Sequence, residues 1–157
     1  MPTKTERPDT SIQQPPLLSK YSVNKVGSNF FILSIVIGIM TMILTSILMS
    51  KDIAKKYKFS LIMALIGSLC PITLLLLLIV LNYFGINIKL MIGQIGEMIL
   101  ILFFLAAAIC LQITSLVIKP QKVESYKGLS MTIQVFVYLG IIVEILASII
   151  GVIGYVL

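Results

Sequence analysis

The sequence predicts an all-α integral membrane protein, a four-helix transmembrane up-down bundle with an extended polar N-terminal tail. The chain of 157 residues is 59% hydrophobic and 11% charged, whereas a soluble domain is about 45–50% apolar and about 25% charged. Four apolar runs follow one another along the chain, and each reaches the roughly 20 residues that cross a hydrocarbon core. The connections between them are short, which makes neighbouring helices antiparallel.

The first segment, residues 1–28, differs in composition from the rest of the chain. It is rich in proline, serine, threonine, glutamine and lysine, and it has few large apolar side chains. Such a segment buries too little surface to offset the entropy lost on ordering. We therefore expect this tail to be extended or disordered unless it lies on a partner. It lacks the short apolar core and small-residue cleavage site of a signal peptide.

The membrane domain is expected over residues 29–157. A segment in lipid must satisfy its own backbone hydrogen bonds, so each apolar run is predicted to be a helix. The third and fourth runs exceed the thickness of the bilayer core, so these helices should tilt or protrude. The predicted spans are 30–49, 59–81, 90–118 and 131–157.

The lysines beside the spans predict an orientation, because basic loops stay in the cytoplasm. Loops 50–58 and 119–130 together hold seven lysines, whereas the opposite face has Lys89 in the middle loop and Lys20 and Lys25 near the membrane end of the tail. We expect both loops in the cytoplasm and both termini on the opposite side. The net charge of +6 then indicates contact with lipid headgroups, without nucleic acid as a partner.

Several kinds of chemistry are excluded by residues that the chain lacks. There is no histidine, so this chain offers no imidazole base and no histidine ligand for haem, copper or iron. Cys70 and Cys110 lie singly inside apolar runs without a CxxC spacing, and we interpret them as small apolar side chains rather than metal ligands. We expect no metal site, no cofactor bound by this chain alone and contacts with lipid. No soluble substrate can be identified.

Small and weakly polar residues recur on one face of each span. Helices in lipid gain little by hiding leucine from leucine, so their packing relies on such residues. Pro71 should also kink the second span, because it removes a backbone hydrogen bond to the carbonyl of Gly67. The positions expected at helix contacts are Gly38, Thr41, Thr45, Pro71, Ala108, Gln112, Gly140 and Gly151.

Two carboxyl groups, those of Glu97 and Glu144, lie inside the predicted spans. Glu97 comes early in its run and is expected near the interface, whereas Glu144 lies close to the middle of the membrane. A charge at that depth costs about 2.5–3.5 kcal/mol on insertion scales. No lysine or arginine occurs within a span to pair with Glu144. An acid in this position is a candidate functional or inter-subunit contact.

Three interpretations of Glu144 remain open from the sequence. It can be protonated and donate a hydrogen bond inside the bundle, to Thr41, Thr45, Ser68 or Gln112. It can be ionised and meet a basic group or a water-filled path in another subunit. It can also take up and release a proton or cation during transport, with Glu97 as the entry residue.

The last helix carries a local resemblance to a known family. Its segment "VEILASIIGVIGYVL" is similar to the last helix of four-helix proteolipid subunits of rotary ATPases, in which a mid-span glutamate lies within a small-residue face. The resemblance implies proton carriage by Glu144. It covers this helix alone, because the first span is bulky where proteolipids have dense glycine runs.

Two functions are compatible with these features. We expect a non-catalytic accessory or structural subunit of a larger membrane complex, with other membrane subunits and lipids as partners. An energy-transducing complex, respiratory or proton-translocating, is one such complex. The alternative is a small oligomeric ion- or proton-coupled transporter, or a translocating subunit, that uses Glu144.

Overall fold

The computed structural model describes residues 20–52, 55–118 and 126–156. The elements within these ranges are all α-helices, and each is long and apolar enough to cross a membrane. The helices are α1 (Lys20–Met49), α2 (Lys55–Tyr83), α3 (Ile88–Val117) and α4 (Lys127–Val156). The prediction of an all-α, multi-pass membrane protein with four spans is confirmed.

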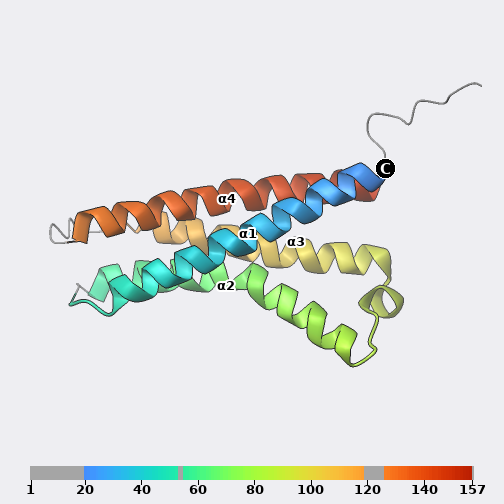
Figure 1. The fold of residues 1–157 in the computed structure, drawn as a ribbon, viewed down its shortest axis with the longest axis horizontal. Coiled ribbons are helices and arrows are strands. Elements are labelled where there is room, and N and C mark those ends of the chain that lie inside the picture. The colour runs from blue at the N-terminus through green and yellow to red at the C-terminus, as the bar shows by residue number, and fades with distance from the viewer. Residues whose placement is uncertain (1–19, 53–54, 119–125, 157) are drawn as a thin grey trace, which may run out of the picture.

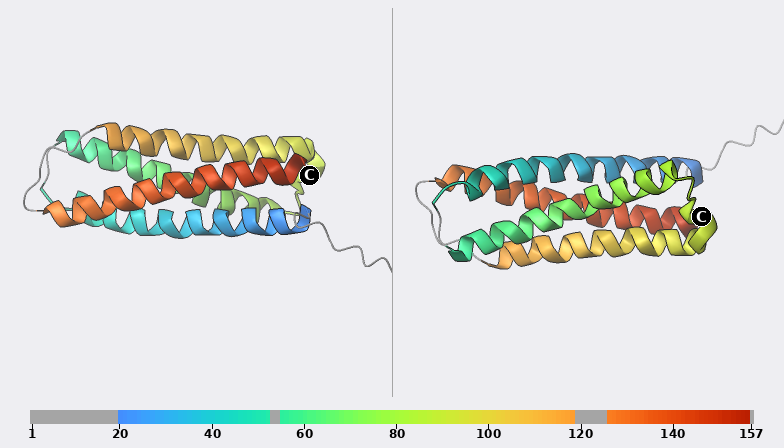
Figure 2. Two further views of the ribbon diagram at one scale, coloured as in Figure 1. Left: turned by 90° about the horizontal axis from the view of Figure 1, so that it is seen from above. Right: turned by 90° about the horizontal axis from the view of Figure 1, so that it is seen from below.

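The helices form an elongated up-down bundle in which α1 lies along α4 and α2 lies along α3 (Figures 1 and 2). The start of α1 meets the end of α4, where a Cβ atom placed on Gly154 would lie 3.3 Å from a methyl carbon of Val23. The first and last helical turns therefore lie at the same end of the bundle.

The first helix begins earlier than the sequence predicted. Residues 20–28, expected to be part of an extended tail, form the first turns of α1. The last proline of the tail is Pro16, so nothing beyond it bars a helix, and Val23 is buried at 6% exposure. The hydropathy of a sequence identifies the apolar part of a span, so it does not predict polar helical turns that extend beyond the hydrocarbon core. The rest of the predicted tail, residues 1–19, lies outside the described residues.

The third span is interrupted at Gly93, which corrects the single helix predicted over 90–118. Gly93 has φ 73° and ψ 170°, a conformation that glycine adopts without steric cost. The short piece before it starts at Asn87, whose side chain accepts a hydrogen bond from the Lys89 amide at 3.1 Å. Figure 1 shows this piece turned across the end of the bundle. The part of α3 that runs along the bundle therefore starts at Gln94.

The second helix contains Pro71 near its middle. A proline has no N–H to donate to the carbonyl four residues earlier, here that of Gly67, and its ring crowds the preceding turn. Figure 1 shows α2 changing direction, so that its second half diverges from α1 and α4. The sequence predicted this kink. It separates α2 from α1 and α4 at the end of the bundle that holds the first turn of α1.

The two ends of the bundle are consequently packed differently. At the end near the 50–54 connection, a cluster of buried apolar residues closes the bundle, and Tyr57 donates a hydrogen bond to Ser130 at 2.6 Å. At the opposite end the helices line an open cavity of about 460 Å³. The buried cluster consists of Leu48, Tyr57, Leu61, Ala64, Ile133 and Val137.

A substitution at Gly38 tests the close approach of α1 and α2. A Cβ atom on Gly38 would lie 2.9 Å from the backbone oxygen of Ser68, and a backbone atom cannot move aside cheaply. We expect Gly38→Ala to lower the free energy of unfolding by about 1–3 kcal/mol, measured by denaturation in mixed micelles. The matched control is Gly128→Ala in α4, where an added Cβ meets nothing within 4 Å. Equal stability of the two variants would contradict this packing.

Candidate functional site

The carboxyl group of Glu144 is enclosed at the centre of the bundle. The side chain lies midway along α4 and is 1% exposed. Its Oε1 atom accepts a hydrogen bond from Gln112 Nε2 of α3 at 3.1 Å and a longer one from Ser34 Oγ of α1 at 3.4 Å. One carboxyl oxygen therefore joins three of the four helices.

Two glycines leave the space that the Gln112 side chain occupies. A Cβ atom on Gly67 of α2 would lie 2.9 Å from Gln112 Cγ, and one on Gly140 of α4 would lie 3.1 Å from Gln112 Oε1. Gln112 is thus held between α2 and α4, with its amide directed to Glu144. The small residues at these positions allow a long polar side chain to cross the middle of the bundle.

The sequence identified only one of the hydrogen-bond partners of Glu144. Gln112 was among the predicted partners, but it donates to Glu144 rather than accepting from it. The other three candidates were wrong. Thr41 and Ser68 donate to carbonyls of their own helices, at 2.9 Å and 2.8 Å, as hydroxyls on helices commonly do, and Thr45 Oγ1 is buried without a partner in the described part of the chain.

Ser34 is the partner that sequence reasoning missed. It lies on the small-residue face of α1, seven residues before Thr41, and is 1% exposed. Two residues seven positions apart share one face of a helix, but this spacing does not tell which of the two lies at the depth of Glu144. That depth depends on how far α1 is shifted along α4, which the sequence of either helix alone does not specify.

Three buried polar oxygens lack hydrogen-bond partners among the described residues: Glu144 Oε2 and Gln112 Oε1 at the centre, and Thr45 Oγ1 about three turns from Ser34 along α1. A buried polar atom without a partner costs free energy, so each of these oxygens retains the capacity to accept a hydrogen bond, and the carboxyl oxygen of Glu144 can also bind a proton. Within the described ranges no cluster of three or more metal-ligating side chains occurs, and Cys70 and Cys110 are free thiols.

The second intramembrane acid, Glu97, lies far from the first. It falls in the first turn after the break at Gly93, where an acidic side chain is favoured by the helix dipole. Gln112 bonds to Glu144 and so marks its depth on α3. The 15 residues from Glu97 to Gln112 correspond to about 22 Å along this helix. Glu97 is half-buried and lines the cavity at the open end of the bundle. The two carboxyl groups therefore belong to separate environments.

The positions predicted at helix contacts have two different surroundings. Gly151 is exposed, and a Cβ atom added there meets nothing within 4 Å. It lines the cavity instead of a contact, because α2 has diverged at this end and no neighbouring helix closes over it. The others are all buried: Gly38, Thr41, Thr45, Pro71, Ala108, Gln112 and Gly140.

Comparisons with known proteins do not assign this arrangement to a family. No protein-family model, no curated protein and no solved structure matches the chain.

Two substitutions at Glu144 separate hydrogen bonding from charge. Glu144→Gln keeps an oxygen that accepts from Gln112 and Ser34, whereas Glu144→Leu leaves both donors unsatisfied. We expect the leucine variant to be less stable than the glutamine variant by about 1–2 kcal/mol, the value that model peptides give for polar contacts between membrane helices. Unfolding of both variants in mixed micelles measures the difference. A leucine variant as stable as the wild type would exclude a structural role for these bonds.

Proposed function

We propose that the chain is a non-catalytic accessory subunit of a larger membrane complex, of the energy-transducing kind. The observation that carries the proposal is the position of Glu144, whose carboxyl group is 1% exposed and accepts hydrogen bonds from Gln112 and Ser34. The carboxyl group at mid-membrane thus has a structural role, because it links helices of its own chain. This structural role requires neither a substrate nor a reaction.

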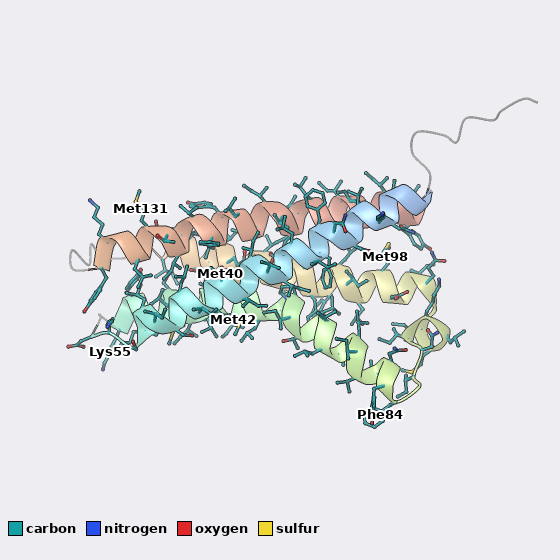
Figure 3. The ribbon with its side chains drawn as sticks, in the orientation of Figure 1. Met40, Met42, Lys55, Phe84, Met98 and Met131 are labelled. Atoms are coloured by element: carbon teal, nitrogen blue, oxygen red, sulfur yellow. The ribbon has the colours of Figure 1, made fainter. Side chains whose placement is uncertain are left out.

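The diverging end of α2 supports the assignment of other membrane subunits as partners. Four large side chains beside the connection to α3 are 70–85% exposed, namely Tyr83, Phe84, Leu90 and Met91. Figure 3 shows Phe84 directed away from the bundle at this tip. Large side chains at the end of a helix that has left its own bundle offer a neighbouring helix a contact surface.

Crosslinking from the tip of α2 tests this proposal. A photo-reactive amino acid in place of Phe84 should crosslink the tagged chain to another polypeptide in native membranes. The same group at Met131, which is also exposed but lies at the opposite end, is the control. Gentle detergent extraction and mass analysis would then identify the partner. A chain that is extracted alone and crosslinks only to lipid from both positions would contradict the role of accessory subunit.

One observation favours a second function, a small oligomeric ion- or proton-coupled transporter. The cavity lined by Glu97 reaches inward to Ala147, three residues after Glu144 on α4. Glu144 Oε2 has no hydrogen-bond partner in the described part of the chain. A proton that entered past Glu97 could therefore bind Glu144 Oε2, which lies about one helical turn beyond the cavity.

Proton flux into liposomes distinguishes the two functions. If Glu144 carries protons, Glu144→Gln should abolish flux while the protein remains assembled, because glutamine keeps the hydrogen-bond acceptor but does not titrate. Asp52→Asn, outside the helices, should leave flux unchanged. Purified wild-type protein that conducts no protons above the background of empty liposomes would exclude the transporter.

The proposed orientation places loops 50–58 and 119–130 in the cytoplasm and both termini on the other side. It is supported by the seven lysines of these loops, since basic residues near spans remain in the cytoplasm. In this orientation the cavity lies in the half of the bundle away from the cytoplasm, and the buried cluster near the 50–54 connection lies on the cytoplasmic side.

A further inference from the structure

The cavity at the open end of the bundle has the dimensions of a small-molecule site. Its volume is about 460 Å³, within the roughly 300–1,000 Å³ of typical ligand pockets. Residues of all four helices line it, including Leu78 from the diverging half of α2. Met98 of α3 also lines it, and Figure 3 shows this residue on the side of α3 where α1 and α4 lie. The cavity exists because α2 bends away after Pro71 and because Gly151 contributes no side chain.

The lining combines an apolar wall with polar groups from the helix ends. Phe31, Ile101, Leu102 and Leu105 supply much of the wall. Asn24, Ser28 and Gln94 also face the cavity, and they lie in the first turns of α1 and of the spanning part of α3. A ligand that fits must therefore have an apolar body and a polar head.

The charge of the lining restricts what the head can be. Glu97 is the single acidic residue among the described residues that line the cavity, and no lysine or arginine shares the lining with it. A half-buried carboxylate without a basic neighbour attracts a cation more strongly than it would in water. Phe31 and Tyr155 add aromatic rings to the same lining, and the faces of such rings attract cations as well.

We propose that this cavity binds an amphipathic organic cation, with its charged head at Glu97 and its apolar body along the wall that ends at Leu105. A neutral acyl chain would pack along the apolar wall but leave the carboxyl group of Glu97 unpaired. An anion would be repelled by that carboxyl group. The site does not depend on the role of accessory subunit or on proton carriage by Glu144, because it uses neither a partner chain nor the central hydrogen bonds.

A pair of ions of the same shape and opposite charge tests the proposal. The isolated chain in lipid nanodiscs is titrated with tetraphenylphosphonium and with tetraphenylborate, and binding to empty nanodiscs is subtracted. We expect saturable binding of the cation only. Glu97→Gln should weaken it about tenfold, which corresponds to about 1.4 kcal/mol, and Asp52→Asn, which removes an acid outside the cavity, should not.

A second variant tests the cavity independently of the charge. Gly151→Leu places a side chain in open space within the cavity, so it should abolish binding without displacing a neighbour. Gly128→Leu adds the same side chain to α4 where there is also open space but no cavity lining, and it should bind the cation as the wild type does. Circular dichroism and size-exclusion chromatography confirm folding. If Glu97→Gln fails to fold, Gly151→Leu decides alone.

Three results would overturn the proposal. The first is equal binding of the phosphonium and the borate, and the second is a wild-type affinity in a folded Glu97→Gln or Gly151→Leu variant. The third is a phospholipid that native mass spectrometry finds on the chain, that the cation does not displace, and whose retention is lost in Gly151→Leu. That result would make the cavity a lipid site.

Discussion

The hydrogen bonds to a single oxygen of Glu144 are the interaction on which the arrangement of the bundle depends. Hydrophobic burial cannot hold helices together in lipid as it does in water, because lipid tails are as apolar as leucine. Polar contacts and close packing must supply the specificity. Here Gln112 of α3 and Ser34 of α1 both donate to Glu144 of α4, and this fixes the rotation and depth of three helices relative to one another.

The fourth helix is tied to the same point by packing rather than by a hydrogen bond. Gly67 of α2 lies against the Gln112 side chain, and Gly140 of α4 lies on its amide. Beyond this level Pro71 turns α2 away, so the bundle is closed at one end and open at the other. The central contact and the cavity are thus two consequences of small residues and a proline placed around one polar side chain.

The sequence predicted the spans well and the details within them less well. Four runs of apolar residues have few alternatives to four helices, because lipid leaves no other way to satisfy their backbones. The break at Gly93 was missed because a glycine in an apolar run is compatible with both a helix and a turn. The helical start at Lys20 was missed because hydropathy is silent on polar turns outside the membrane. Gln112 was a predicted partner of Glu144 because a polar side chain inside a span needs a hydrogen-bond partner. The choice of Ser34 over Thr41 depends on how far α1 is shifted along α4, which neither helix specifies alone.

A double-mutant cycle between Glu144 and Gln112 tests the central contact most directly. The free energies of unfolding in mixed micelles are compared for Glu144→Leu, Gln112→Leu and the double variant. If the two side chains stabilise the bundle through their hydrogen bond, the effects of the single variants will not add. The coupling should be about 0.6 kcal/mol, the average of double-mutant cycles between membrane helices, and should not exceed their maximum of about 1.7 kcal/mol. Additive effects, with no coupling energy, would contradict the account.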